Sequence, residues 1–161
     1  MAMDLFLEIK GVEGESLKQN HEGHIEIHGF SMGITQSGSF HELGAGGGAG
    51  KAEIQDLTVS KSVDKSSPLL FKMSATGEHI DEVIITAQKA GGEAIEYYKI
   101  IMTHVIVSAL HNSGSTHDDR VDETVTFNCA KMEFKYKEQL AGGGEGPVVA
   151  ASYDMQRNVA S

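Results

Sequence analysis

Alternation of apolar and polar residues with a period of two runs through most of this chain of 161 residues. Within residues 3–9, Leu5 and Leu7 share one face of an extended chain. Asp4 and Glu8 lie on the opposite face. Such alternation is typical of β-strands that are buried on one side only. The chain is therefore predicted to be mainly β.

The same pattern, punctuated by glycines, divides the rest of the chain. Strands are predicted over about residues 3–9, 24–35, 52–63, 80–89, 95–110, 121–136 and 148–159, with glycine turns at 90–93 and 141–146. The strand over 95–110 is apolar on both faces, and we expect it to be central with both sides covered. One short helix is expected, with Ser66 or Ser67 as its N-cap, Pro68 at its first position and Gly77 as its stop.

Two of the predicted strands change their apolar phase part of the way along. Ile27 lies in one phase and Phe30 in the other, with Gly29 between them. A second shift falls between Cys129 and Met132. Bulges cause such shifts and help sheets to curl. We therefore predict a small β-barrel of two curved sheets with one short α-helix and a long glycine-rich loop.

That loop lies within residues 36–51 and contains too many glycines for a strand or a helix. Long loops in compact domains are usually functional, and Phe40 and Leu43 provide apolar anchors within this one. The loop ends in a Gly-Lys pair at Lys51, which suggests a phosphate-binding loop. Ala52 stands where that motif needs Ser or Thr, and a strand is expected next instead of a helix, so we exclude this interpretation.

Charge and hydropathy exclude several classes of partner. The formal net charge of −10, with no basic run, argues against binding to nucleic acid or to an anionic membrane. No apolar stretch reaches the ~18 residues that span a bilayer, so membrane insertion is not expected. Asp4 and Glu8 interrupt the apolar N-terminal run, and no basic segment precedes it. We therefore expect synthesis in the cytoplasm and no cleaved signal peptide.

Histidine is frequent, and one group of residues suggests a metal. His24, Glu26 and His28 share one face of a predicted strand, and His21 precedes them. Two His and one Glu are a known zinc ligand set. A solvated polar strand face explains the same alternation more simply, and the other histidines lie in separate segments. No metal or other cofactor is expected.

Nothing in the pattern of nucleophiles or carboxylates identifies a catalytic site. Cys129, the only cysteine, shares its apolar phase with Val125 and Phe127, which is typical of a buried, inert thiol. It excludes an internal disulfide. The charged run from His117 to Arg120 is interpreted as a turn. We expect a protein that is not an enzyme.

Several segments together match one known family in order along nearly the whole chain. They are Met3-Asp4-Leu5-Phe6-Leu7-Glu8-Ile9, residues 11–16, Ser31-Met32-Gly33, Gln36-Ser37-Gly38-Ser39, Asp56-Leu57, Asp64-Lys65-Ser66-Ser67-Pro68, Lys89-Ala90-Gly91-Gly92, Tyr97-Tyr98, Val107-Ser108 and Tyr153-Asp154. On these residues the chain resembles the haemolysin-coregulated protein (Hcp) family, the tube proteins of type VI secretion. Some members carry an extra C-terminal toxin domain. We expect a single domain over residues 1–161 with no appended effector domain.

The resemblance implies a working assembly. Six barrels would close into a hexameric ring, and rings would stack into a tube that a contractile sheath expels. The sheath and the spike and baseplate proteins of the secretion apparatus would be its partners. Effector proteins would travel in the lumen, and Ser31 would face this cargo. The tube would assemble in the bacterial cytoplasm and then reach the extracellular space or a target cell. The residues expected in a ring-stacking loop are Phe40, His41, Glu42, Leu43, Gly46, Gly47, Gly48 and Lys51.

Two other functions remain open from the residues alone. The first is a monomeric ligand-binding β-barrel in which the glycine-rich loop is a lid. The second is a metal-dependent enzyme that uses His24, Glu26 and His28.

Overall fold

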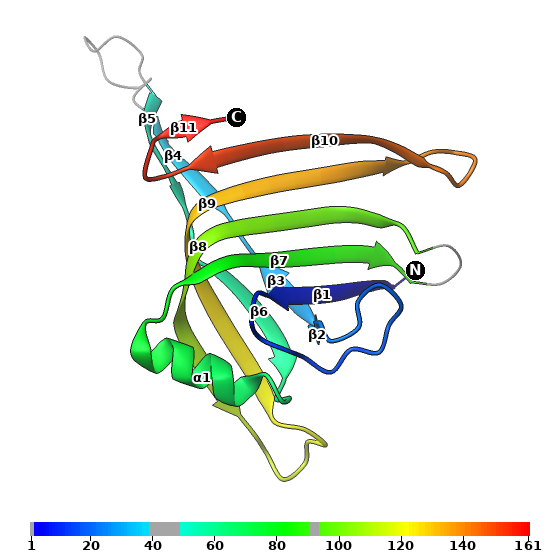
Figure 1. Ribbon diagram of the computed structural model, residues 1–161, viewed down its shortest axis with the longest axis vertical. Coiled ribbons are helices and arrows are strands. Elements are labelled where there is room, and N and C mark those ends of the chain that lie inside the picture. The colour runs from blue at the N-terminus through cyan, green and yellow to red at the C-terminus, as the bar shows by residue number, and fades with distance from the viewer. Residues whose placement is uncertain (1, 39–48, 91–93) are drawn as a thin grey trace.

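The computed structural model describes residues 2–38, 49–90 and 94–161, and the backbone alone at residue 49. Its elements are mostly strands, with one helix at the side (Figure 1). They are β1 (Met3–Ile9), β2 (Ile25–Glu26), β3 (Gly29–Ser31), β4 (Ile34–Gly38), β5 (Ala49–Ile54), β6 (Leu57–Ser62), α1 (Ser67–Thr76), β7 (Ile80–Lys89), β8 (Glu96–Ser113), β9 (Asp122–Gln139), β10 (Glu145–Asp154) and β11 (Val159–Ala160).

The strands form one large antiparallel sheet and a separate two-stranded arm. The large sheet runs in the order β11-β10-β9-β8-β7-β1-β2, while β6 pairs with β9 and β3 pairs with β6. The arm is β4 paired with β5. The predicted curved, mainly β architecture with one short helix is confirmed, although the sheets do not close fully. Only two register pairs join β1 to β2, and three join β3 to β6.

A change of pairing partner replaces the bulge predicted at Gly29. The Ile27 N–H donates to the Leu5 carbonyl of β1 at 3.2 Å. The next N–H, of His28, donates to the Ser60 carbonyl of β6 at 2.7 Å. The strand predicted over 24–35 is therefore divided between two neighbours. This crossing segment is the seam of the barrel.

The hairpin of β8 and β9 has two strands of 18 residues each and bends in the middle. Before the bend β8 buries Ile100 and Met102, and after it Val105 and Val107. Between them lies His104, which has a left-handed backbone with φ of 54°. The prediction that this strand is covered on both sides was wrong, because its two apolar phases belong to the two sides of a bend.

β9 changes partner near the same level. Its first half pairs with β6 as far as Phe127, and its second half pairs with β10 from Lys131 onward. The phase shift predicted between Cys129 and Met132 falls in this interval, and both side chains are buried. One pair of long strands thus serves two differently oriented parts of the sheet.

Helix α1 begins and ends as its residues predict. Ser66 is the N-cap, so Ser67 is the first residue of the helix and Pro68 the second, one position later than predicted. Gly77 ends the helix in the left-handed region, with φ of 67°, where a residue without Cβ meets no steric penalty. Leu70 is fully buried and anchors the helix to the core.

The core inside the barrel consists of aliphatic side chains from nearly every strand. Its fully buried members include Leu7, Ile25, Leu57, Val59, Val83, Ile85, Ile100, Val125 and Phe127. Burial of such side chains contributes about 1.5–3 kcal/mol each.

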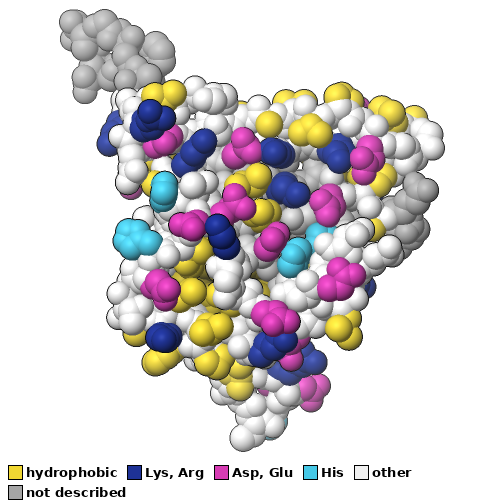
Figure 2. All heavy atoms as spheres, viewed as in Figure 1, with side chains coloured by type: hydrophobic (Ala, Val, Ile, Leu, Met, Phe, Trp, Pro, Cys, Tyr) yellow, Lys and Arg dark blue, Asp and Glu magenta, His cyan; other side chains and the backbone are white. Residues whose placement is uncertain are grey.

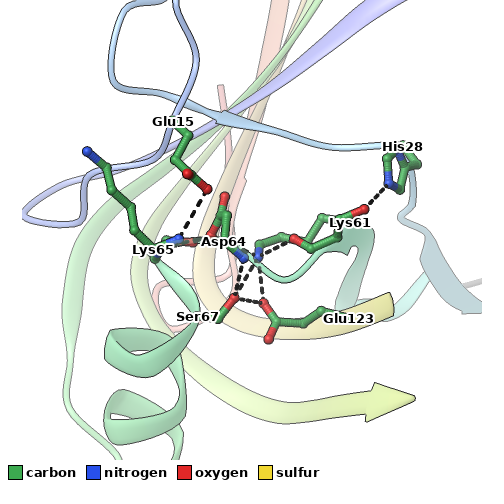
Figure 3. Close-up of polar contacts among 9 residues, drawn as sticks. Glu15, His28, Lys61, Asp64, Lys65, Ser67 and Glu123 are labelled. Carbon is green, nitrogen blue, oxygen red and sulfur yellow. Dashed lines mark hydrogen bonds and ion pairs between the residues drawn. The ribbon is translucent and has the colours of Figure 1, made fainter. Parts of the chain in front are cut away.

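A buried ion pair joins β6, β9 and α1 at one end of this core (Figure 3). Lys61 of β6 and Glu123 of β9 are register partners, and neither side chain is exposed. The Lys61 Nζ lies 2.6 Å from a Glu123 oxygen, 3.2 Å from Asp64 Oδ1 and 3.1 Å from the hydroxyl of Ser67. The Ser67 hydroxyl donates to Glu123 at 2.9 Å. Because Ser67 is the first residue of α1, the pair positions the helix.

Lys61→Met is expected to destabilise the protein by about 3–5 kcal/mol, because the buried Glu123 carboxylate then has no counter-charge. Urea unfolding at a fixed protein concentration measures the change. Lys10→Met is the matched control. It removes a lysine that lies 3.5 Å from Asp81 in an exposed pair, and it should cost less than about 1 kcal/mol. Equal unfolding midpoints for the two variants would contradict the role of Lys61.

Candidate functional site

Ser31 lies on a surface of small hydroxyl side chains outside the barrel. It is exposed and pairs with Thr58 of β6, which pairs with Thr126 of β9. Direct partners in antiparallel strands point to the same side of a sheet. The Thr58 and Thr126 hydroxyl oxygens are 3.2 Å apart, within hydrogen-bond distance.

The next row of partners continues this surface. Ser60 pairs with Gly29 on one side and with Thr124 on the other, and Thr124 pairs with His111 of β8. We call the surface formed by Ser31, Thr58, Ser60, Thr124 and Thr126 the hydroxyl face. Its side chains are short and uncharged, and each hydroxyl both donates and accepts hydrogen bonds. It can therefore contact varied polar polypeptide surfaces without requiring one sequence.

Asp56 lies just before β6, and each of its carboxylate oxygens accepts one hydrogen bond from a neighbour. One oxygen accepts a hydrogen bond from Asn128 at 2.7 Å, and the other accepts one from the Ser108 hydroxyl at 3.0 Å. These contacts give Asp56 a structural role beside the hydroxyl face.

A second surface is apolar and continues the core face of the sheet. Along one row, Ile100 of β8 pairs with Phe134 of β9, which pairs with Ala151 of β10. Ile100 is fully buried, whereas Phe134 is 40% exposed. In the next row Tyr136, 46% exposed, pairs with Val149, 67% exposed. Phe134, Tyr136 and Val149 are therefore on the same side of the sheet as the core, but no strand covers them in the part of the chain that the structure describes.

We call this surface, formed by Phe134, Tyr136, Val149 and Ala151, the wing. Figure 1 shows β10 at the edge of the sheet with β9 next to it, at the opposite end of the sheet from β1 and β2. The opposite side of these strands is different, because Lys and Glu side chains are interspersed there (Figure 2). The ion pair between Lys135 and Glu133 is one example. A solvated outer side and an uncovered apolar inner side mark the wing as a contact surface.

β10 also has a free edge beside the wing. β11 pairs only with Tyr153 and Asp154, and the Ser152 backbone pairs with Ser161. Within the described ranges no strand pairs with residues 145–151 on that side. Free edges expose unpaired backbone groups that can join another chain.

The arm of β4 and β5 projects from the main sheet (Figure 1). All five residues of β4 are exposed, and so is Lys51 of β5. Of the residues predicted for ring stacking, only Lys51 is described. Phe40, His41, Glu42, Leu43, Gly46, Gly47 and Gly48 lie outside the described residues. The arm carries both ends of the segment that contains them.

The residues considered for a zinc site point in different directions. His28 Nε2 lies 2.9 Å from the Ser62 hydroxyl, whereas His24 approaches His21 and Glu8. Within residues 2–38, 49–90 and 94–161, no group of three or more His, Cys, Asp or Glu side chains could hold a metal ion.

Cys129 is 5% exposed, in the wall of a groove of about 1050 Å³ that Asp56, His104 and Met155 also line. Burial, and then the negative charge of Asp56, raises the pKa of the Cys129 thiol to about 11. The thiolate, which is the reactive form, is thereby disfavoured.

The wing is the candidate contact surface that sequence reasoning missed. The alternation of Met132, Phe134 and Tyr136 predicts a core-facing row and nothing more. A visible signal was that the next strand along the chain, β10, offers the small side chains of Ala150, Ala151 and Ser152 beside that row.

The fold and these surfaces define a class: a bent antiparallel β-barrel with a side helix and a projecting arm. A family model described as "Type VI secretion system effector, Hcp" matches residues 6–136. The protein Hcp1 of Pseudomonas aeruginosa is 40% identical over 161 residues, with 99% of each chain covered.

Solved structures agree. A type six secretion system protein matches with a TM-score of 0.94 at 26% identity, covering 99% of this chain and 100% of that one. Hcp1 from Salmonella typhimurium matches with a TM-score of 0.84 at 33% identity, covering 100% of both chains. The chain belongs to the Hcp family of type VI secretion proteins.

The resemblance found in the sequence is therefore confirmed. Hcp proteins are type VI secreted proteins, and the Hcp family is not a known enzyme family. In the part of the chain that the structure describes, no helix is both long and apolar enough to cross a membrane.

Alkylation tests the chemistry of Cys129. A pKa raised from 9.0 to about 11 lowers the thiolate fraction at about pH 8 by about 100-fold. Iodoacetamide should therefore label the folded protein at least about 100-fold more slowly than the urea-unfolded chain. Between about pH 8 and pH 10 the folded rate should keep rising, about tenfold per pH unit. A folded rate that levels off by about pH 9 would contradict the raised pKa.

Proposed function

We propose that this chain is the ring subunit of a type VI secretion tube. Six copies form a hexameric ring, rings stack into a tube, and the tube carries effector proteins in its lumen. It assembles in the bacterial cytoplasm, works with the sheath, spike and baseplate proteins, and is then expelled to the extracellular space or a target cell. Family membership and three surfaces support this proposal.

The observation that carries the ring is the uncovered wing beside the free edge of β10. A monomer would leave Phe134, Tyr136 and Val149 in water although they continue a packed core row. A neighbouring copy that covers the wing removes this apolar area from water and can pair with the edge. A contact between two different surfaces of identical subunits builds a closed ring when the rotations from one subunit to the next add up to a full turn.

The hydroxyl face supports a lumen that holds varied cargo. Ser31, Thr58 and Thr126 offer short, uncharged, hydrogen-bonding side chains over adjacent strands. A wall of this kind binds polypeptides weakly and releases them again. We assign Ser31 to the cargo-facing wall.

The arm supports stacking. β4 is exposed along its whole length, and the arm projects beyond the sheet (Figure 1). We assign the loop from Phe40 to Lys51 to contacts between rings.

Val149→Glu tests ring closure. Val149 is 67% exposed in the single chain, so the subunit should fold, but in a ring the new charge would be buried without a partner at a cost of several kcal/mol. In native mass spectrometry the parent protein should give hexamers and the variant monomers at the same concentration. Leu17→Glu is the matched control, because Leu17 is 92% exposed and is not part of the wing, and this variant should stay hexameric. A parent protein that is monomeric at every concentration would favour the ligand-binding barrel instead.

Ser31→Gln tests the lumen assignment. The longer side chain should lower recovery of effector proteins in a pull-down by several-fold, because it projects above the short side chains of the hydroxyl face. Thermal stability should be unchanged, because Ser31 is exposed. Ser115→Gln, at an exposed turn, is the matched control. Unchanged recovery of every effector would refute the assignment.

A further inference from the structure

His21 is a buried histidine that no surface described above uses. It is 3% exposed and stacks on Phe6 of β1 with ring centroids 4.1 Å apart and planes within 2°. It lies in the segment of residues 10–24 that links β1 to β2. Phe6 points away from the barrel core, so this segment covers the outer side of β1 and β7.

Two neighbouring acceptor oxygens show that Nε2 of His21 carries a hydrogen. His21 Nε2 lies 3.0 Å from a carboxylate oxygen of Glu96 and 3.2 Å from Gln88 Oε1. An ionised carboxylate only accepts hydrogen bonds. Nε2 of His21 therefore carries a hydrogen.

The other nitrogen of His21 faces a second histidine. His21 Nδ1 and His24 Nδ1 are 3.1 Å apart, and a hydrogen bond between them needs one hydrogen, not two. On its far side, His24 Nε2 lies 3.7 Å from Glu8 Oε2. That distance exceeds a hydrogen bond, so His24 Nε2 is free to take up a first added proton beside Glu8. The close contacts of the pair are satisfied when Nε2 of His21 carries one hydrogen and the facing Nδ1 atoms share another.

A second added proton breaks this arrangement. Both Nδ1 atoms would then carry hydrogens and face each other at contact distance, with two like charges on the rings. The charged groups around the pair are Glu8 on β1 and Glu96 and Lys99 on β8, while β7 contributes the neutral Gln88. Both carboxylates contact Nε2 atoms, so neither restores the contact between the Nδ1 atoms.

The pair is directly connected to the seam of the barrel. His24 immediately precedes β2, which has only two register pairs with β1. The Ser16 N–H donates to the His24 carbonyl at 3.0 Å. A Cβ added to Gly14 would lie 2.4 Å from that same carbonyl oxygen, so the segment packs closely against His24. Displacement of His24 therefore loosens both the segment and the two-pair contact between β1 and β2.

We propose that His21 and His24 form an acid-sensitive clamp that holds residues 13–26 against β1 when the pair shares one hydrogen and releases them when both rings are fully protonated. The release opens the seam, where the chain crosses from β1 to β6. The clamp is a property of the single chain, so it does not depend on tube assembly.

Hydrogen exchange measured by mass spectrometry tests the clamp on the full chain. An imidazole in water gains its proton near about pH 6.5, so exchange is compared at about pH 7.5 and about pH 5, corrected for the intrinsic rate. Peptides covering residues 13–26 should lose at least about tenfold of their protection at the lower pH, while peptides of β8 and β9 keep theirs. His24→Gln, whose side-chain amide donates a hydrogen to His21 but gains no charge, should retain protection at both pH values.

His117→Gln, in an exposed turn, is the matched control and should lose protection as the parent chain does. Full protection of the parent at about pH 5, or an equal loss in His24→Gln, would overturn the clamp. If His24→Gln does not fold, nitrogen NMR of the parent imidazoles at about pH 7.5 decides. A hydrogen on His21 Nε2 supports the clamp, and a bare Nε2 overturns it.

Discussion

The bend in the β8–β9 hairpin is the constraint on which the rest of the structure depends. At His104 the backbone enters the left-handed region, which is rare for a residue other than glycine, and β9 exchanges β6 for β10 as its partner. A straight pair of 18-residue strands would form one long flat sheet. The bend instead lets the first part of β9 close over the barrel core and the second part leave it, so the core and the exposed wing share the same two strands.

The part of this hairpin nearest its turn, where β9 pairs with β6, is held by polar packing as well as by apolar burial. Lys61 and Glu123 pair across β6 and β9 with no exposure, and Ser67 connects them to the start of α1. Buried ion pairs contribute little net stability compared with apolar residues, but they tolerate few alternative arrangements. In this chain the pair determines where the helix begins relative to the two strands.

Much of the fold could be predicted because alternation and turn residues act locally. The strands over 3–9 and 80–89 and the helix stop at Gly77 agree with the structure. The strand predicted over 24–35 did not, because apolar phase shows which side of a strand is buried and not which strand covers it. For the same reason Ser31 could be assigned only by family resemblance, whereas its hydroxyl neighbours Thr58 and Thr126 required the register of three strands.

By itself, the sequence determined the fold class, the helix that follows Ser66, the family and the absence of an internal disulfide, since each rests on residue type or local spacing. Only the tertiary structure decided the rest. It brought His21 against Phe6 and Glu96, divided the strand predicted over 24–35 between β1 and β6, and left Phe134, Tyr136 and Val149 without cover. These features depend on contacts between segments far apart in the chain, and local periodicity carries no information about such contacts.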